Sequence, residues 1–298
     1  MKLYIWKKIT MKKIHVGFML SYDYEKLKNS IPPVYEHADA IFIAEDQEYR
    51  TWSGKKFEVD TSFYEWIREF DSKNKIQIYK DNFYVPQLSP IENDTRERTM
   101  LSEKMGVGNW LVQVDADEYF IDFKKFADTL HRYDHFLKDP KKTPVQISGF
   151  YINMFKYIED GLLYVNYPTK VLLATNDPCY TYARQTKKRI IYTDNLLIHE
   201  CVSRSEADLL MKFTNWGHAN DFDIAEYIRK WKSVNKDNYK EMEDFFYLQP
   251  EGWKTLDYLG TKDLEEIKRQ LHAKPELHPS AWFLFHKNLG QYFKHLFK

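Results

Sequence analysis

The residues best suited to chemistry in this chain are three carboxylates that follow a strand-like segment. Residues 110–114 read Trp-Leu-Val-Gln-Val, and Asp115-Ala116-Asp117-Glu118 comes directly after them. On an extended backbone, residues i and i+2 point to the same side, so we expect Asp115 and Asp117 to share a face. Two carboxylates this close repel each other, and a bound cation relieves that repulsion. Hard oxygen ligands favour Mg²⁺ or Mn²⁺, ions that commonly also hold a substrate's phosphates.

The position of this Asp-x-Asp segment distinguishes it from a second copy, Asp221-Phe222-Asp223. The second copy has no strand before it, so it is predicted to form a turn and cap a helix. The first copy follows a strand, and ligand sites in open α/β sheets lie outside the carboxyl ends of strands. A solvated turn is the alternative interpretation of the first copy.

A second pair of reactive residues, His199-Glu200, follows an apolar run over 190–198 and is also expected at a strand end. His199 is a candidate third metal ligand beside Asp117, and a hydrogen-bonded structural histidine is the alternative. Glu200 is a candidate general base for a sugar hydroxyl, and an ion-pair partner for Arg204 is the alternative. His218 is an alternative metal ligand, although capping of a helix over 222–233 explains most of its segment.

Four further residues are candidates for substrate contacts. Asp46 ends a buried strand at the sheet edge where a nucleotide is expected. Arg98 lies on the predicted helix before the Asp115 strand, where a guanidinium can reach a diphosphate, and an exposed helix face with Glu97 and Glu103 as ion-pair partners is the alternative. Lys170 begins an apolar strand and is a second candidate for phosphate, with an ordinary surface lysine as the alternative. Asp160 lies in an acidic Asp-Gly turn and is a candidate base on an acceptor loop, although a simple hairpin turn is the alternative.

The elements that position these residues alternate between strand and helix through the first 120 residues. Short apolar runs predict strands over 14–20, 40–44, 75–79 and 110–114. Helical spacing predicts helices over 61–71 and 92–105, whereas Pro32-Pro33 breaks the pattern over 24–38. Such alternation is typical of a parallel sheet with helices on its faces. Later segments are predicted as a helix near 123–130, strands over 145–155, 162–174 and 190–198, and helices over 205–215, 222–233, 236–247 and 261–272.

Composition excludes several classes of protein. Lysine plus arginine equals aspartate plus glutamate at 44 each, so the net charge does not favour a nucleic-acid partner. The two cysteines, Cys179 and Cys201, do not predict a disulfide framework or a zinc knuckle. A reducing, cytoplasmic compartment fits this cysteine usage. No glycine-rich dinucleotide fingerprint and no phosphate-binding P-loop follows the first strand.

On these residues the chain resembles the GT-A glycosyltransferases, close to family 2 and its bacterial lipopolysaccharide-core and capsule relatives. The matching segments are Ser21-Tyr22-Asp23, Glu45-Asp46, Arg98, residues 110–118, residues 167–173 and residues 198–200. The resemblance implies an α/β, Rossmann-like, mostly parallel sheet flanked by helices over 12–202, with a helical C-terminal extension over 203–298. The chain departs from the family after the second strand, where Glu-Asp-Gln-Glu-Tyr replaces the usual Asp-Gly-Ser-x-Asp. The identity of the donor nucleotide is therefore not determined by the resemblance.

The resemblance implies transfer of a sugar from a nucleoside-diphosphate donor to a glycan or glycolipid hydroxyl. Asp115, Asp117 and His199 would hold Mn²⁺ or Mg²⁺, Glu200 or Asp160 would take the acceptor proton, and direct attack would invert the anomeric carbon. A metal-dependent nucleotidyltransferase or phosphodiesterase, and a non-catalytic carbohydrate-binding module, are the alternatives. The aromatic and basic segment 281–298 is predicted to pack as a helix on the catalytic domain, with contact to the inner face of a membrane as the alternative.

Overall fold

The computed structural model describes residues 13–215, 222–248 and 252–296. The strands are β1 (Ile14–Leu20), β2 (Ala40–Asp46), β3 (Ile76–Asp81), β4 (Trp110–Val114), β5 (Glu118–Phe120), β6 (Val145–Ile158), β7 (Gly161–Val165), β8 (Thr169–Thr175), β9 (Arg189–His199) and β10 (Leu256–Leu259). The helices are α1 (Leu27–Ser30), α2 (Pro32–Tyr35), α3 (Thr61–Phe70), α4 (Pro90–Met105), α5 (Phe123–Arg132), α6 (Glu206–Asn215), α7 (Ile224–Ser233), α8 (Leu264–His272) and α9 (Ala281–Leu296).

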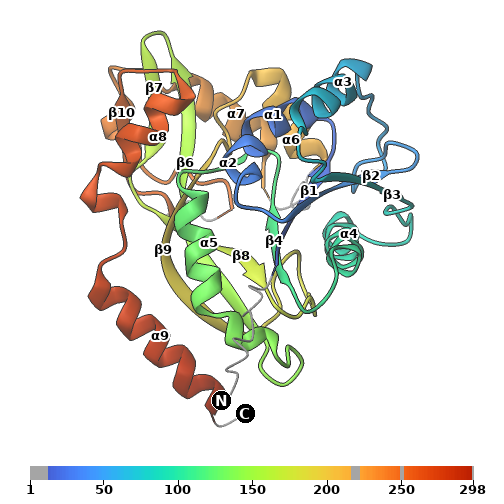
Figure 1. The fold of residues 1–298 in the computed structure, drawn as a ribbon. Helices are drawn as coiled ribbons and strands as arrows, with labels where there is room; N and C mark the ends of the chain where they lie inside the picture. The colour runs from blue at the N-terminus through green and yellow to red at the C-terminus, as the bar shows by residue number, and fades with distance from the viewer. Residues whose placement is uncertain (1–12, 216–221, 249–251, 297–298) are drawn as a thin grey trace, which may run out of the picture.

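The predicted α/β fold is confirmed, because helices flank a large sheet whose first four strands are parallel (Figure 1). The sheet order is β10-β7-β6-β8-β4-β1-β2-β3, and β9 pairs with β5 and β6. The strands β1, β2 and β4 are aligned in parallel, so their carboxyl ends lie at one edge of the sheet. Antiparallel pairing of β8 with β4 then extends the sheet on the other side.

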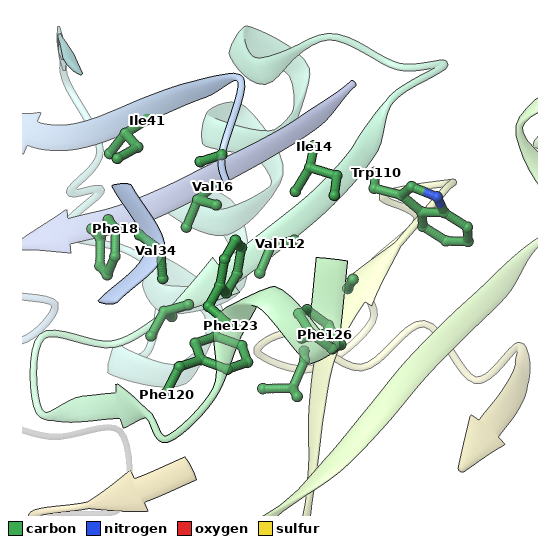
Figure 2. Close-up of a cluster of buried hydrophobic side chains, with 14 of the residues drawn as sticks. Ile14, Val16, Phe18, Val34, Ile41, Trp110, Val112, Phe120, Phe123 and Phe126 are labelled. Carbon is green, nitrogen blue, oxygen red and sulfur yellow. The ribbon is translucent and has the colours of Figure 1, made fainter. Parts of the chain in front are cut away.

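The main core explains why the apolar runs became strands. Alternate residues of β1 and β4 (Ile14, Val16, Phe18, Trp110 and Val112) are fully buried in one cluster with aromatic residues that follow β5 (Figure 2). Burial of side chains of this size from water supplies roughly 2–3 kcal/mol each. The strands that lead to the predicted site are therefore fixed by the core beneath them.

Helix α4 is held close to β1 by a residue without a side chain. A Cβ placed on Gly17 would lie 2.7 Å from the Met105 sulfur and 2.9 Å from a Leu101 methyl group. The helix begins at a capping box in which Ser89 and Glu92 satisfy each other's backbone groups. The start of α4 and its distance from the sheet are thus both determined, and α4 carries Arg98 toward the Asp115 segment.

The last third of the chain is mainly helical but differs from the prediction in two places. The predicted helix over 236–247 is reduced to a 3₁₀ turn at Tyr239–Glu241, and Leu256–Leu259 forms β10, which pairs with β7. Within the described residues, no helix combines the length and apolar character needed to cross a membrane. Helix α9 lies along β9 on the outside of the molecule (Figure 1).

Candidate active site

The Asp115-Ala116-Asp117 segment lies on a cavity of about 250 Å³ at the carboxyl ends of β1, β2 and β4. The cavity is also lined by α4, by the loop that carries Arg184, by the end of β9 and by α6. This is the edge of an open α/β sheet where ligands bind, because the strand ends and loops there leave a crevice between the helices. The sequence-based placement of the segment beyond a strand end therefore matches its position in the fold.

Asp115 is held between two guanidinium groups. Arg98 donates to Asp115 Oδ1 at 2.9 Å and to Asp94 Oδ1 at 2.5 Å, and Arg184 lies 3.6 Å from Asp115 Oδ2. Burial by itself would raise the pKa of Asp115, but Arg98 and then Arg184 outweigh it and lower the pKa below its usual value. Asp115 is therefore an ionised carboxylate whose position is set by α4.

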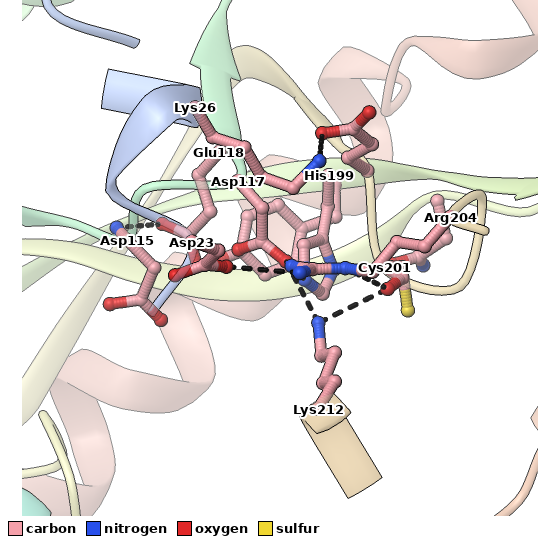
Figure 3. Close-up of polar contacts among 12 residues, drawn as sticks. Asp23, Lys26, Asp115, Asp117, Glu118, His199, Cys201, Arg204 and Lys212 are labelled. Carbon is pink, nitrogen blue, oxygen red and sulfur yellow. Dashed lines mark hydrogen bonds and ion pairs between the residues drawn. The ribbon is translucent and has the colours of Figure 1, made fainter. Parts of the chain in front are cut away.

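Asp117 is bound even more firmly by cations. Lys212 of α6 donates to Asp117 Oδ2 at 2.8 Å, and Arg204 donates to the same oxygen (Figure 3). Burial would raise the pKa of Asp117, but Lys212, Arg204 and His199 together hold it well below its usual range. The two aspartates that were expected to repel each other are thus each neutralised by protein side chains.

His199 reaches Asp117 as the sequence predicted, because β5 pairs with β9. That pairing places Glu118 opposite His199, and the backbone N–H of Glu200 donates to the carbonyl of Asp117 at 2.9 Å. His199 Nε2 lies 3.7 Å from Asp117 Oδ2, and its Nδ1 lies 2.9 Å from Asn153 Oδ1. The ring is therefore oriented by Asn153 through Nδ1, and its Nε2 is directed to Asp117 at the cavity wall.

Asp46 lines the cavity, but its oxygens are already used. They accept from the backbone N–H groups of Glu48, Phe83 and Tyr84 at 3.0 to 3.3 Å, and from the Arg50 side chain at 2.9 Å. Such a set of donors holds the pKa of Asp46 below its usual value although burial opposes it. Asp46 thus shapes the loop after β2, and Trp52 on that loop faces the cavity.

Three other predicted site residues lie outside the cavity lining. Glu200 accepts from Tyr119 at 2.6 Å and forms an ion pair with Lys26 at 2.5 Å. Asp160 is at the exposed β6–β7 turn, where it pairs with Lys236. Lys170 is exposed on β8. Asp160 and Lys170 therefore lie on separate surfaces, whereas the backbone of Glu200 is bonded to Asp117 and its carboxylate is directed to Lys26 and Tyr119.

Several cavity residues were not predicted as site residues from the sequence, and four of them carry charge close to the Asp115 segment. Arg184, Lys212 and Glu97 were not singled out, and Arg204 was considered only as a partner for Glu200. Arg184 contacts Glu118 and Tyr151, and its loop has no strand-end or motif signal. Lys212 faces the cavity only because α6 packs beside the end of β9. These contacts depend on tertiary packing, so no local pattern predicts them.

Charges in the cavity are almost entirely paired with one another. Seven carboxylates and five lysine or arginine side chains line it. Six of the carboxylates form ion pairs with those five cations. Among the described residues Glu97 is the exception, because its carboxylate accepts from the neutral Trp52 Nε1–H at 2.6 Å. Burial without a paired cation raises the pKa of Glu97 to about 8.

As arranged, these side chains do not fit a divalent metal. In the described part of the chain, no group of three or more His, Cys, Asp and Glu side chains is placed to hold one. Asp117 Oδ2, the oxygen nearest His199, already faces Arg204 and Lys212. A metal there would need to displace two cations of its own sign. The predicted Mn²⁺ or Mg²⁺ site of Asp115, Asp117 and His199 therefore finds no support in the donor set.

Comparisons with known proteins leave the function to be inferred from this site. None of the protein-family models searched matches the chain, and no curated protein matches it. A crystal structure of S. aureus TarS 1-349 aligns at a TM-score of 0.27 with 12% identity, covering 50% of this chain and 37% of that one. The chain thus spans little more than a third of that structure, and a likeness of this degree says nothing about activity.

Proposed function

We propose that this protein is a glycosyltransferase that moves a sugar from a nucleoside-diphosphate donor to a hydroxyl of a glycan or glycolipid. One observation carries the proposal: the Asp115-Ala116-Asp117 segment lies on a cavity at the ends of parallel strands, among five lysine and arginine side chains. Nucleotides bind at this edge of α/β sheets. Guanidinium and ammonium groups are the side chains that recognise phosphate.

The proposed reaction breaks the bond between the anomeric carbon and the diphosphate oxygen and forms a bond from the acceptor hydroxyl oxygen to that carbon. The hydroxyl proton passes to a base, and the nucleoside diphosphate leaves with the bonding electron pair. Stabilisation of the charge on that leaving group is the main electrostatic task. Lys212 suits it, because its ammonium has three N–H donors and two are used by Asp117 and the Cys201 carbonyl. We expect direct attack with inversion of the anomeric carbon.

We propose that a carboxylate on the cavity wall, in place of Glu200 or Asp160, is the base. An acceptor enters from solvent, so a base must be both ionised and reachable. Asp115 and Asp23 retain the most exposure among the paired carboxylates, with side chains 30% and 17% exposed. In this proposal lysine and arginine side chains, in place of Mn²⁺ or Mg²⁺, neutralise the charge of the leaving diphosphate. No step of the proposed reaction therefore passes through a metal.

The first test is thermal unfolding of the full chain in UDP, GDP, CDP or dTDP, with and without Mn²⁺. We expect one nucleotide to raise the melting temperature without the ion. The variant Lys212→Ala should lose this shift, and Lys236→Ala, which removes an exposed lysine that pairs with Asp160, should keep it. No shift with any nucleotide would favour a non-catalytic carbohydrate-binding module.

Product analysis with the matching nucleoside-diphosphate sugar then tests the chemistry. Glycosyl transfer, or slow hydrolysis without an acceptor, releases a nucleoside diphosphate. Release of pyrophosphate or of a nucleoside monophosphate would instead indicate a nucleotidyltransferase or phosphodiesterase. Those enzymes generally use two metal ions about 4 Å apart, each of which needs free carboxylate oxygens.

A further inference from the structure

Helix α9 differs from an ordinary surface helix because most of its apolar side chains are exposed. None of its residues from Ala281 to Leu296 is buried. Its contacts with β9 are made by amides: Gln291 accepts from the Ile190 N–H at 3.1 Å, and Asn288 exchanges hydrogen bonds with the Tyr192 backbone at 2.8 and 2.9 Å. The helix therefore packs on the catalytic domain as predicted, through these amides, through Leu284 against the core cluster beside β9, and through Phe283, whose ring lies 6.1 Å from that of Phe150. The rest of its apolar surface does not face the domain.

Five other apolar side chains of α9 form one stripe directed away from β9. At 3.6 residues per turn, the stripe falls within an arc of roughly 80°. It consists of Trp282, Phe285, Leu289, Phe293 and Leu296, all exposed. Trp282 is 69% exposed, Phe285 56% and Phe293 51%, values that a large ring reaches only when little protein covers it. A contiguous exposed apolar surface on a soluble domain indicates an interaction site.

The charge around α9 identifies the kind of partner. Residues 281–298 contain three lysines and no aspartate or glutamate, although acids and bases balance over the whole chain. Lys170 of β8 is close enough to Lys287 and Lys294 that, after burial, their charges are the next causes that lower its pKa. Within the described residues, Lys170, Lys287 and Lys294 form no ion pair with a carboxylate. Arg189 adds a further cation over the Tyr292 ring.

We propose that α9 lies in the headgroup region of an anionic lipid membrane, with its aromatic stripe inserted and its lysines at the lipid phosphates. An interfacial helix has an apolar face rich in Trp and Phe and a basic polar face. The 16 residues of α9 extend about 24 Å, less than the ~30 Å of a bilayer core, so the helix lies along the surface. A second copy of the chain fits less well, because two such helices would bring only like charges together.

The test is co-sedimentation of the full chain with vesicles of mixed phosphatidylglycerol and phosphatidylcholine, and with vesicles of phosphatidylcholine alone. We expect binding to the anionic vesicles. The double variant Phe285→Glu/Phe293→Glu should bind at least ~100-fold more weakly. Lys287→Gln/Lys294→Gln should lose about 30-fold on anionic vesicles. Both pairs are exposed, so folding should persist, as near-ultraviolet circular dichroism can verify.

A matched control introduces the same charge elsewhere. Ile78→Glu/Val107→Glu places two carboxylates at exposed apolar positions outside α9 and should leave vesicle binding unchanged. Equal binding to both kinds of vesicle, or equal loss in this control, would overturn the proposal. So would light scattering that gives twice the 36.0 kDa chain mass in the native protein and a single mass in Phe285→Glu/Phe293→Glu, because the stripe would then join two copies.

Discussion

Charged side chains are usually exposed and aromatic ones buried, but the cavity and helix α9 each reverse one half of this rule. In the cavity, ionised side chains are buried, and six carboxylates find their counter-charges among five cations of the same cavity. On α9, aromatic rings are exposed and the lysines have no carboxylate partner in the described structure. Charges that are paired internally need nothing else for stability, whereas an uncovered apolar stripe gains free energy only from another surface. Six of the seven cavity carboxylates are thus balanced by cations within the protein, whereas the stripe on α9 needs a partner surface to cover it.

The largest expected effect comes from breaking the pairing at Asp117. Asp117→Ala leaves Arg204 and Lys212 buried without their shared counter-charge, which should cost about 3–5 kcal/mol of unfolding free energy. Nucleotide binding and transfer should be lost as well. Urea unfolding and product analysis measure the two effects.

Asp160→Ala is the control for that variant, because it removes an ion-paired carboxylate from an exposed turn. It should leave both unfolding and activity unchanged. A similar loss in both variants would mean that the cavity pairing is not special. Loss of activity alone in Asp160→Ala would restore this residue as the base.

A smaller effect, dependent on pH, is expected from the unpaired carboxylate of the cavity. Burial raises the pKa of Glu97 to about 8 in the folded protein, from an ordinary value of 4.5. The folded state therefore binds a proton that the unfolded state releases, and stability from this group is full below pH 4.5 and is lost as pH rises toward 8. Glu97→Gln should flatten this slope and raise unfolding free energy near pH 8 by the order of a few kcal/mol. The measurement is urea unfolding at several pH values from 5 to about 8. If the unfolding free energies of the variant and the native protein fall with pH at the same rate, the raised pKa of Glu97 is contradicted.

Shortening an exposed aromatic side chain of α9 should change the unfolding free energy very little. Trp282 contacts only Phe285 and His286 of its own helix among the ring contacts described, so Trp282→Ser should alter the unfolding free energy by less than about 0.5 kcal/mol. Vesicle binding should fall in the same variant. A large loss of stability would show that the stripe is covered within the molecule.

No effect at all is expected from removal of divalent ions. Because Arg204 and Lys212 stand where a metal would bind Asp117, EDTA should leave nucleotide binding and product formation unchanged. A loss that Mn²⁺ restores would show instead that an ion enters with the donor and displaces Lys212. Assays with and without EDTA, at one ionic strength, decide between these outcomes.

Most of the fold that supports the site was predictable, because it depends on local patterns. The apolar runs before Leu20, Asp46 and Asp115 became strands at the predicted positions, and Asp223 caps α7 by accepting from the Glu226 N–H. The predicted helix over 236–247 failed because Asn side chains near its start bond to the backbone and favour turns. His218 lies outside the described residues.

The composition of the site was less predictable than its location. Asp115 and Asp117 were found from their position after a strand, and Arg98 from its helix. Arg184, Arg204 and Lys212 come from a loop, a turn and a helix that approach the cavity only after distant strands pair. Alternation and spacing report which face of an element is buried, and they carry no information on which loop faces which strand end.

The contact between α6 and Asp117 has a consequence for the order in which the protein is made. Arg204 and Lys212 follow the sheet residues of the cavity in the chain. A nascent chain that has left the ribosome only as far as residue 202 carries both aspartates but neither of these cations. Closure of the cavity around Asp117 must therefore wait until Lys212 has been translated and released.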